Sequence, residues 1–320
     1  MRVLIVTNMW PTPEQPARGV FVQRQVEALR RTGQVEVTVA AFSATGRPWE
    51  YLRQAIALRR RKAEADLVHA HFGLSALTAL GAIWDGQPLV LTVHGRDCHH
   101  PVTRAVTRAV ARRCAAVVAV SRELAAICPF PTMDIIPAGV DTHHFQPCSR
   151  QEARARLRIT ASERFVLFPS DPARSEKRYD RARALAASLP GLGLRSYHHT
   201  PPQETPLWIA AADAVLVTSD REGYGLACME ALACNVPVLS TPVGIAPEVL
   251  PRVPGTLCAP FSVSTWRQEL QRILADPDPH VPGREAALEH STDAMARRTV
   301  VLYREVLRRA RREESRSAEA

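Results

Sequence analysis

Short apolar runs alternate with helical stretches along most of the chain. Val3 to Thr7 and Pro88 to Val93 have the length of buried strands, whereas Phe21 to Arg31 carries apolar residues at helical spacing. Alternation of helices with nearly continuous apolar strands is typical of a parallel sheet that is covered on both faces. The sequence therefore predicts an α/β protein with doubly wound parallel sheets.

The alternation breaks around Phe145 to Ser149 and then begins again. Apolar runs at Phe165 to Phe168, Ala214 to Thr218 and Val236 to Ser240 predict a second sheet. A chain of 320 residues is long for one hydrophobic core and comfortable for two. We predict one Rossmann-like domain over residues 1–147, a second over residues 148–291, and a last helix with a basic tail over residues 292–320.

The bulk properties limit the class of protein. The formal net charge of +9 suits an anionic partner such as a nucleotide or a lipid headgroup. Nucleic acid is not expected, because no helix-turn-helix, zinc-finger or RNP pattern accompanies the charge. The 7 cysteines are scattered singly, which is typical of reduced thiols in the cytoplasm. No apolar run approaches the ~18 residues of a membrane span, so we expect a cytoplasmic protein whose basic surface can contact the inner membrane face.

One strand–loop–helix segment carries the residues with the clearest chemistry. The apolar run that ends at Thr218 leads into a loop with Glu222, Gly223 and Gly225, and an apolar helix follows in which Glu230 is the only charge. The N-terminus of a helix is a site for phosphate, and glycines let the backbone approach a ligand closely. A carboxylate such as Glu230 can accept from two ribose hydroxyls. The alternative is that Glu230 pairs with an internal arginine while Glu222 is solvated.

The same segment resembles a known family. Glu222 through Glu230 is similar to the Glu-x7-Glu motif of the family 4 glycosyltransferases, group 1 type, which have the GT-B fold. Further stretches that resemble the family are Arg18 to Val22, Asp66 to His71, Thr92 to Gly95 and Ile136 to Asp141. The resemblance implies two Rossmann-like domains facing a cleft, with the acceptor side in residues 1–147 and the nucleotide-sugar side in residues 148–291. It also implies a crossover helix that returns to the N-terminal domain.

The resemblance implies a role for each matching residue. Arg174 and Lys177 match the basic pair that holds the donor diphosphate, and Gly19 matches a glycine that approaches the phosphates. Glu230 matches the ribose-binding residue, and Glu222 matches the residue near the donor sugar. The expected donor-binding set is Gly19, Arg174, Lys177, Glu222, Gly223, Tyr224, Gly225, Leu226 and Glu230.

His94 matches the histidine near the transferred sugar, and we expect it to act in catalysis with Glu222, Arg174 and Lys177. Asp97 is either an acceptor-side contact or a solvated loop residue. The histidines also raise the alternative of a metal site, and the residues concerned are His69, His71, His94, His99 and His100. No Cys or carboxylate spacing completes such a site, so we expect no metal ion and a structural role for His69.

The activity implied is a retaining, metal-independent transfer of a sugar from a UDP- or GDP-linked donor to an acceptor hydroxyl, with no other cofactor. The acceptor is a small molecule or a lipid-linked saccharide. Two alternatives remain open, a nucleotide-sugar epimerase and a non-catalytic binding protein. The chain departs from the family between Phe168 and Ala214, where it is shorter by about one strand–helix unit of ~30 residues, and at Ile245, where the family has glycine.

Overall fold

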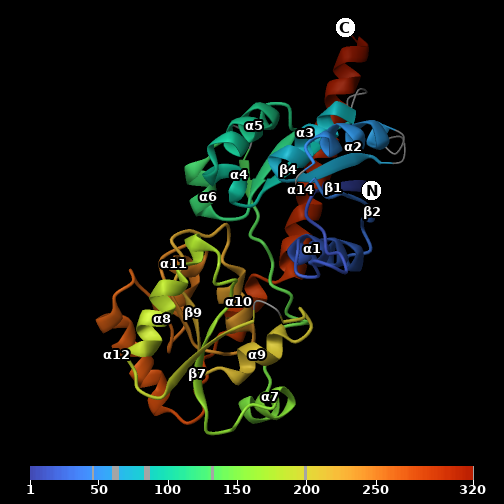
Figure 1. The fold of residues 1–320 in the computed structure, drawn as a ribbon. Helices are drawn as coiled ribbons and strands as arrows, with labels where there is room; N and C mark the ends of the chain where they lie inside the picture. Colours follow the sequence, from blue (N-terminus) through green and yellow to red (C-terminus); the bar gives the residue numbers. More distant parts are fainter. Residues whose placement is uncertain (45–46, 60–64, 83–86, 131–132, 198–199, 320) are drawn as a thin grey trace. The chain divides into compact units, whose positions relative to one another are not determined.

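The computed structural model describes residues 1–44, 47–59, 65–82, 87–130, 133–197 and 200–319 (Figure 1). The chain forms two compact units, residues 1–139 with 292–320, and residues 140–291. The division lies at Val140 rather than at the sequence break near Phe145, because Val140 donates its N–H to the carbonyl of His290 at 2.9 Å and so joins the second unit. Among the described helices, none has the length and hydrophobicity that a bilayer span requires.

The first unit contains a parallel sheet of six strands in the order β2-β1-β3-β4-β5-β6. The strands are β1 (Arg2–Thr7), β2 (Glu36–Ala41), β3 (Leu67–His71), β4 (Leu89–Val93), β5 (Ala116–Ala119) and β6 (Met133–Ile135). Every residue of β3, β4 and β5 is buried, as expected for strands covered on both faces. The predicted doubly wound α/β fold is therefore confirmed in this unit.

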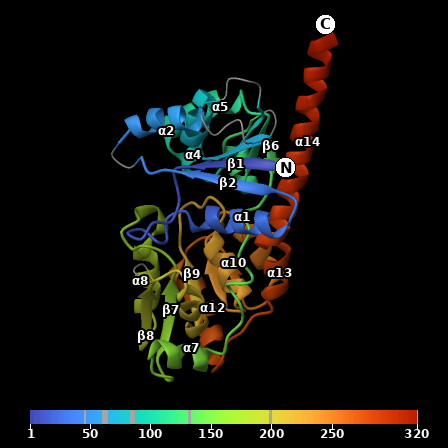
Figure 2. The ribbon, with the colours of Figure 1, turned by 90° about the vertical axis from the view of Figure 1, so that its right-hand side faces the viewer.

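Helices cover both faces of the first sheet (Figure 2). They are α1 (Val20–Arg31), α2 (Trp49–Arg59), α3 (Gly73–Ala82), α4 (Arg96–His99), α5 (Pro101–Ala111), α6 (Arg122–Ile127) and α14 (Thr292–Glu319). Val26 of α1 and Tyr303 of α14 share one core cluster with Ile5 of β1. α2, α3 and α5 pack together on the other face. The helix predicted to begin at Thr292 is therefore part of the first unit, as the resemblance implied.

The second unit contains a parallel sheet of five strands in the order β11-β10-β9-β7-β8. The strands are β7 (Arg164–Phe168), β8 (Leu192–Ser196), β9 (Ala214–Val217), β10 (Val238–Ser240) and β11 (Leu257–Cys258). β8 is an edge strand, and all its residues are only partly buried. It is the one strand described between β7 and β9 along the chain, which agrees with the short segment noted between Phe168 and Ala214.

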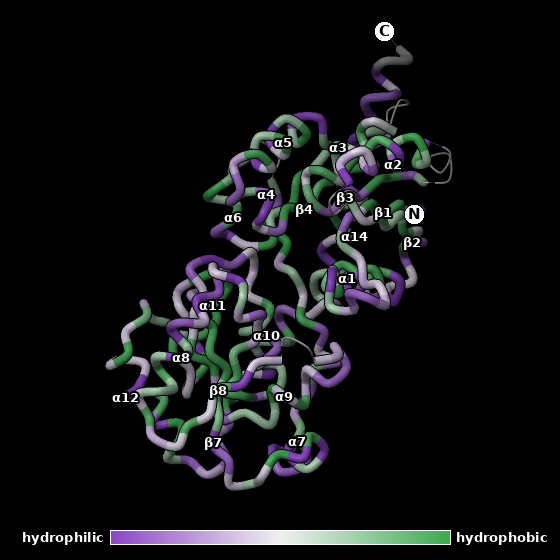
Figure 3. Tube along the Cα trace, in the orientation of Figure 1, coloured by the Kyte–Doolittle hydropathy of each residue, from purple (hydrophilic) through white to green (hydrophobic). Residues whose placement is uncertain are grey.

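Seven α-helices are described in the second unit. The apolar strands that lie between them are green, the colour of hydrophobic residues, in Figure 3. They are α7 (Arg150–Leu157), α8 (Tyr179–Ala187), α9 (Thr205–Ala211), α10 (Leu226–Ala233), α11 (Ala246–Val249), α12 (Val263–Ala275) and α13 (Arg284–Glu289). Leu185 of α8 and Trp266 of α12 share one core cluster with Leu216 of β9. α10 contacts β9 and β10 and also packs against α9 and α13.

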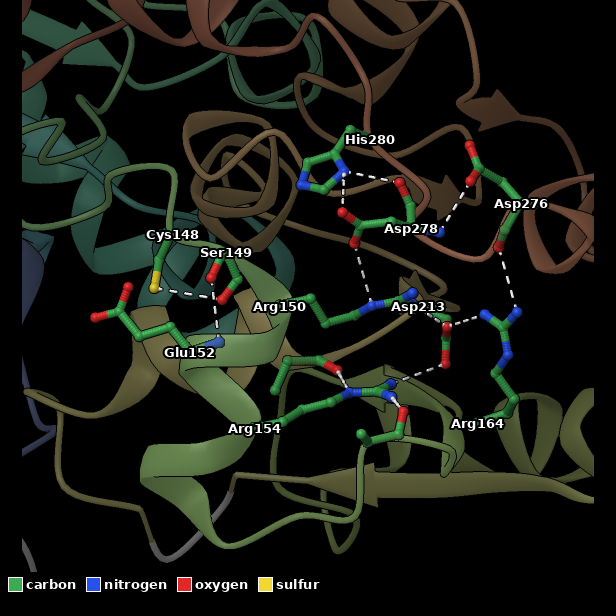
Figure 4. A network of polar contacts seen from close by, with 12 residues as sticks. Cys148, Ser149, Arg150, Glu152, Arg154, Arg164, Asp213, Asp276, Asp278 and His280 are labelled. Atoms are coloured by element: carbon green, nitrogen blue, oxygen red, sulfur yellow. Dashed lines mark hydrogen bonds and ion pairs between the residues drawn. The ribbon is translucent and has the colours of Figure 1, made fainter.

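A buried ionic network ties α7 to the amino-terminal edge of the second sheet (Figure 4). Asp213 is fully buried just before β9. Its carboxylate accepts from Arg150, from Arg164 at 2.6 Å, from Arg154 at 3.4 Å and from the backbone N–H of Phe165 at 2.8 Å. A buried carboxylate needs such partners, because removing a charge from water is costly. This network lies at the edge of the sheet opposite to the strand ends where ligands bind in such folds.

Candidate active site

Two loops meet at the carboxyl-terminal edge of the second sheet. β7 and β9 are parallel neighbours, so the loops that follow them leave the sheet at the same edge. The hydroxyl of Thr218 donates to the carbonyls of Lys177 and Arg178, each at 3.0 Å. The N–H of Asp220 donates to the carbonyl of Glu176 at 2.9 Å. These hydrogen bonds fix the two loops against each other.

The loops bring together two of the residues that the sequence singled out. Nζ of Lys177 lies 2.6 and 2.7 Å from the two carboxylate oxygens of Glu222. Ser219 donates its hydroxyl to the same carboxylate at 2.7 Å. The side chains of Lys177 and Glu222 are only 14% and 13% exposed. The alternative of a solvated Glu222 is therefore wrong, and Ser219 is a contributor that the sequence analysis missed.

Arg174 lies in the same turn as Lys177. Its carbonyl accepts the N–H of Lys177 at 3.0 Å, at the short helix η2 (Ser175–Lys177). Its guanidinium binds Glu176 at 2.6 Å, and its side chain is 53% exposed. Arg174 and Lys177 thus form a pair of cations beside the strand ends, of which Lys177 is the more enclosed.

The start of α10 lies in the loop after β9. Gly225 is its N-cap, with φ of 93°, and no side chain caps this end of the helix. A neighbouring backbone packs closely here, because Ile245 donates its N–H to the carbonyl of Tyr224 at 2.7 Å and a Cβ on Gly244 would lie 2.3 Å from the same oxygen. Because Gly225 has no side chain to cap the helix, the N–H groups of Leu226 and Ala227 can bind an anion.

The remaining donor-side residues have different surroundings. Gly223 lies in the loop between β9 and α10, and Glu230 lies on α10 and is partly buried. Tyr224 is buried, with its hydroxyl 3.2 Å from Nδ1 of His290. Its ring is therefore part of the packing of this loop, whereas its backbone lies at the site.

In the first unit, His94 follows β4 and is enclosed by aromatic rings. The ring centroids of Phe21 and Phe72 lie 4.9 and 4.8 Å from that of His94. Phe72 has a φ of 74°, a conformation that costs a non-glycine residue about 1–3 kcal/mol. Nε2 of His94 lies 2.9 Å from Nδ1 of His71. From the sequence, His71 was considered only as a possible metal ligand, although His69 and His71 share a face of one strand.

Asp97 is buried and holds the backbone around His94. Its carboxylate accepts the N–H groups of His94 and Gly73, each at 2.9 Å. Burial raises the pKa of Asp97, while its backbone hydrogen bonds oppose that shift. The idea that Asp97 is a solvated loop residue is wrong, and its carboxylate positions His94 through these backbone contacts.

His69 has the structural role that the sequence predicted. Its ring nitrogens lie 2.6 Å from the hydroxyl of Tyr303 and 2.7 Å from that of Thr92. Burial lowers the pKa of His71 to about 3 and holds the pKa values of His69 and His94 well below the ordinary range. Within the described residues, no group of three or more His, Cys, Asp or Glu side chains is arranged to hold a metal ion.

The backbone conformation and close packing at position 19 require a glycine. Its φ is 70°, and a Cβ would lie 2.4 Å from the carbonyl carbon and oxygen of Met9. Two residues later, Phe21 lies against His94. Gly19 therefore allows the loop after β1 and the start of α1 to close together beside the histidine.

Known protein families match the sequences of both units. The family described as "Glycosyltransferase Family 4" matches residues 1–144, and the family described as "Glycosyl transferases group 1" matches residues 174–290. A D-inositol 3-phosphate glycosyltransferase of Arthrobacter sp. is 25% identical, over 87% of this chain and 78% of the relative. The protein of the same name from Thermobispora bispora is 27% identical, over 77% of this chain and 72% of the relative.

Solved structures share the fold at low sequence identity. Sucrose-phosphate synthase from Thermosynechococcus elongatus has a TM-score of 0.78 and 18% identity, with 95% of this chain and 98% of that one covered. Anabaena Alr3699/HepE in complex with UDP-glucose has a TM-score of 0.73 and 16% identity, with 95% and 100% covered. The two family matches, the relatives and the two parallel sheets together show that this chain belongs to the group 1, family 4 glycosyltransferases and has their GT-B fold.

Proposed function

We propose that this glycosyltransferase takes its sugar from a nucleoside diphosphate donor held at the carboxyl ends of β7 and β9. The observation that carries the proposal is the enclosed cation Lys177, tied into a loop beside the uncapped N-terminus of α10. Cations and helix N-termini are the groups that bind phosphate oxygens in proteins. The structural neighbour Alr3699/HepE is described in complexes with UDP and with UDP-glucose, which makes UDP the first nucleotide to test, with GDP second.

The proposed step transfers one glycosyl group. The bond between the anomeric carbon and the diphosphate oxygen breaks, and the acceptor oxygen bonds to the same carbon on the same face. The acceptor proton passes to the departing phosphate oxygen, so the products are a glycoside of retained configuration and a nucleoside diphosphate. Lys177, Arg174 and the N–H groups of α10 stabilise the negative charge that develops on the leaving group. These groups supply the positive charge that the step needs, so the proposal includes no metal ion.

The two carboxylates have separate parts in this proposal. Glu222 is held by Lys177 and Ser219, so it is oriented to accept from hydroxyls of the donor sugar. Glu230 of α10 accepts from the ribose. His94 contacts the transferred sugar, and Asp97 holds the backbone of His94.

The acceptor in this proposal is a hydroxyl of a small molecule or of a lipid-linked saccharide. A cytoplasmic protein with peripheral contact at the membrane fits the net charge of +9 and the exposed arginines Arg308, Arg309 and Arg312 of α14. Sedimentation with vesicles tests this part. We expect binding to anionic vesicles at low salt, and its absence would remove the membrane contact from the proposal.

Calorimetric titration of UDP, GDP and ADP tests the donor site directly. We expect one of them to bind the wild type, and Lys177→Ala to weaken that binding at least 10-fold, the scale of one charge-assisted hydrogen bond. Arg183→Ala, which removes an exposed arginine of α8, is the matched control and should bind normally. The donor-site assignment fails if no nucleotide binds, or if Lys177→Ala binds as tightly as the control. A donor screen read by mass spectrometry, with the product anomer assigned by NMR, then tests transfer and retention.

A further inference from the structure

His71 ends β3 and is fully buried, yet one of its ring nitrogens has no hydrogen-bond partner among the residues that the structure describes. Its Nδ1 lies 2.9 Å from Nε2 of His94, and the two rings stack with centroids 5.1 Å apart. Its Nε2 is buried and makes no hydrogen bond with any described residue. Buried polar atoms without partners are rare, and this one limits how the two histidines can share their protons.

Both rings are neutral near pH 7, because burial holds their pKa values far below that pH. A neutral imidazole carries one proton, on one of its two nitrogens. The contact between His71 and His94 requires one proton between the two nitrogens. Either His71 donates from Nδ1, or His94 donates from Nε2 and His71 carries its own proton on Nε2.

The two arrangements leave different groups without a partner. If His94 donates, the unpartnered Nε2 of His71 is a buried N–H. If His71 donates, the same atom is a bare nitrogen with only a lone pair. A buried N–H without an acceptor is the less favourable of the two, just as unpaired donors are rarer than unpaired acceptors among buried backbone groups. We infer that His71 donates its Nδ1 proton to His94 and thereby holds His94 in the tautomer that carries its proton on Nδ1.

His94 is held for this role from three other directions. Phe21 and Phe72 lie against its ring, and Asp97 accepts its backbone N–H. Nδ1 of His94 makes no hydrogen bond to a described residue. The histidine therefore presents an N–H donor to a ligand, which suits a hydroxyl oxygen of the transferred sugar. His71 is a positioning residue, since it acts through His94. This consequence rests on the proposed function, whereas the tautomer itself does not.

The groups that face this pair exclude a simple acid–base relay. His69 stacks on His71 with ring centroids 4.6 Å apart, but its nitrogens bind Tyr303 and Thr92 rather than His71. Asp97 contacts backbone N–H groups of His94 and Gly73. The proton between His71 and His94 is therefore confined to that pair.

Long-range proton–nitrogen correlation NMR of protein with isotope-labelled histidines reads the tautomer without any substrate. We expect a protonated Nδ1 and a bare Nε2 for His94 in the wild type. His71→Phe keeps a stacked ring but removes the donor, and we expect His94 to populate the other tautomer as well. His71→Asn offers an amide N–H near the position of the lost Nδ1–H and should restore the wild-type pattern. A wild-type His94 protonated on Nε2, or a pattern unchanged in His71→Phe, would overturn the inference.

Kinetics on the same variants separates positioning from packing. For His71→Phe we expect kcat to fall on the order of 10–100-fold, as for other residues that orient a functional histidine, with the donor KM nearly unchanged. His71→Asn should recover most of the loss. His69→Phe, the matched control on the same strand, should leave the His94 tautomer unchanged. If His71→Phe does not fold, the wild-type spectrum decides. A wild type with the expected tautomer but no transfer activity would contradict the proposed function and support this inference.

Discussion

Lys177 binds both carboxylate oxygens of Glu222, at 2.6 and 2.7 Å, although the two residues belong to loops that follow different strands. Glu222 also accepts from Ser219 at 2.7 Å, so its charge is balanced before any ligand arrives. A lysine ammonium has three donors, and this one can bind a phosphate oxygen while it keeps a contact with Glu222. The pair is therefore a preformed part of the donor site that we propose.

The stability of this pair can be measured with a double-mutant cycle. Lys177→Met leaves the partly buried Glu222 carboxylate without its cation, and we expect the free energy of unfolding to fall by about 1–3 kcal/mol. The double variant Lys177→Met with Glu222→Gln removes both charges and should lose less than the sum of the two single changes. Urea denaturation measures all four proteins. Additive losses would show that the two side chains are not coupled.

Gly19 and Gly33 form a matched pair for testing backbone strain. Both have positive φ, 70° and 65°. A Cβ on Gly19 would lie 2.4 Å from the Met9 carbonyl, whereas no described atom lies within 4 Å of one on Gly33. We expect Gly33→Ala to cost about 1 kcal/mol, the cost of the left-handed conformation alone. Gly19→Ala should cost roughly 2–4 kcal/mol more, because backbone must move. Equal melting temperatures for the two variants would contradict the close packing at Gly19.

The sequence predicted most of the buried strands but missed several helices, of which α2 and α7 show why. α2 was missed because its apolar residues lie on more than one side: Leu52 and Ile56 are 69% and 56% exposed, whereas Ala55 and Leu58 are buried. α7 was missed because its buried face carries Arg150 and Arg154, which bind Asp213 rather than apolar side chains. Neither helix therefore carries a single apolar stripe that would mark its buried face.

The candidate site was predicted in its residues but not in its contacts. Lys177, Glu222 and His94 were predicted from the resemblance to the family. The approach of Lys177 to Glu222 depends on β7 and β9 being neighbours in the sheet, which residue spacing does not reveal. The contact of His71 with His94 and the contact of Ser219 with Glu222 were not predicted, because a lone His or Ser gives no sign in one sequence of which side chain it approaches.

Substitution of Asp213 tests the ionic network at the amino-terminal edge of the second sheet. Asp213→Asn removes the negative charge that three arginines share, and we expect the free energy of unfolding to fall by about 3–5 kcal/mol. Asp293→Asn is the control, because Asp293 pairs with Arg31 at the surface and the two side chains are 34% and 42% exposed. We expect this exposed pair to contribute less than about 1 kcal/mol. Chemical denaturation of the two variants checks the contrast, and similar losses would show that burial does not set the strength of the Asp213 network.

Because of the buried histidines, we expect the free energy of unfolding to fall as the pH is lowered through the mildly acidic range. Burial lowers the folded pKa of His71 to about 3, whereas an unfolded histidine titrates near ~6.5. Above ~6.5 neither state binds the proton, so this group adds no pH dependence there. Below that pH the unfolded state binds a proton on this histidine, whereas the folded state does not. Each such histidine then removes up to ~1.4 kcal/mol of stability per pH unit.

His69 and His94 contribute in the same direction, because burial holds their pKa values well below the ordinary range. The loss should therefore be steep between about pH 6.5 and 5, a window above the ordinary titration range of most carboxylates. Urea denaturation at several pH values in that window should give a smaller slope for His71→Phe than for the wild type, by up to ~1.4 kcal/mol per pH unit. Equal slopes would mean that His71 takes up a proton in the folded protein as readily as in the unfolded chain, which a fully buried imidazole without an acceptor for a second N–H does not do.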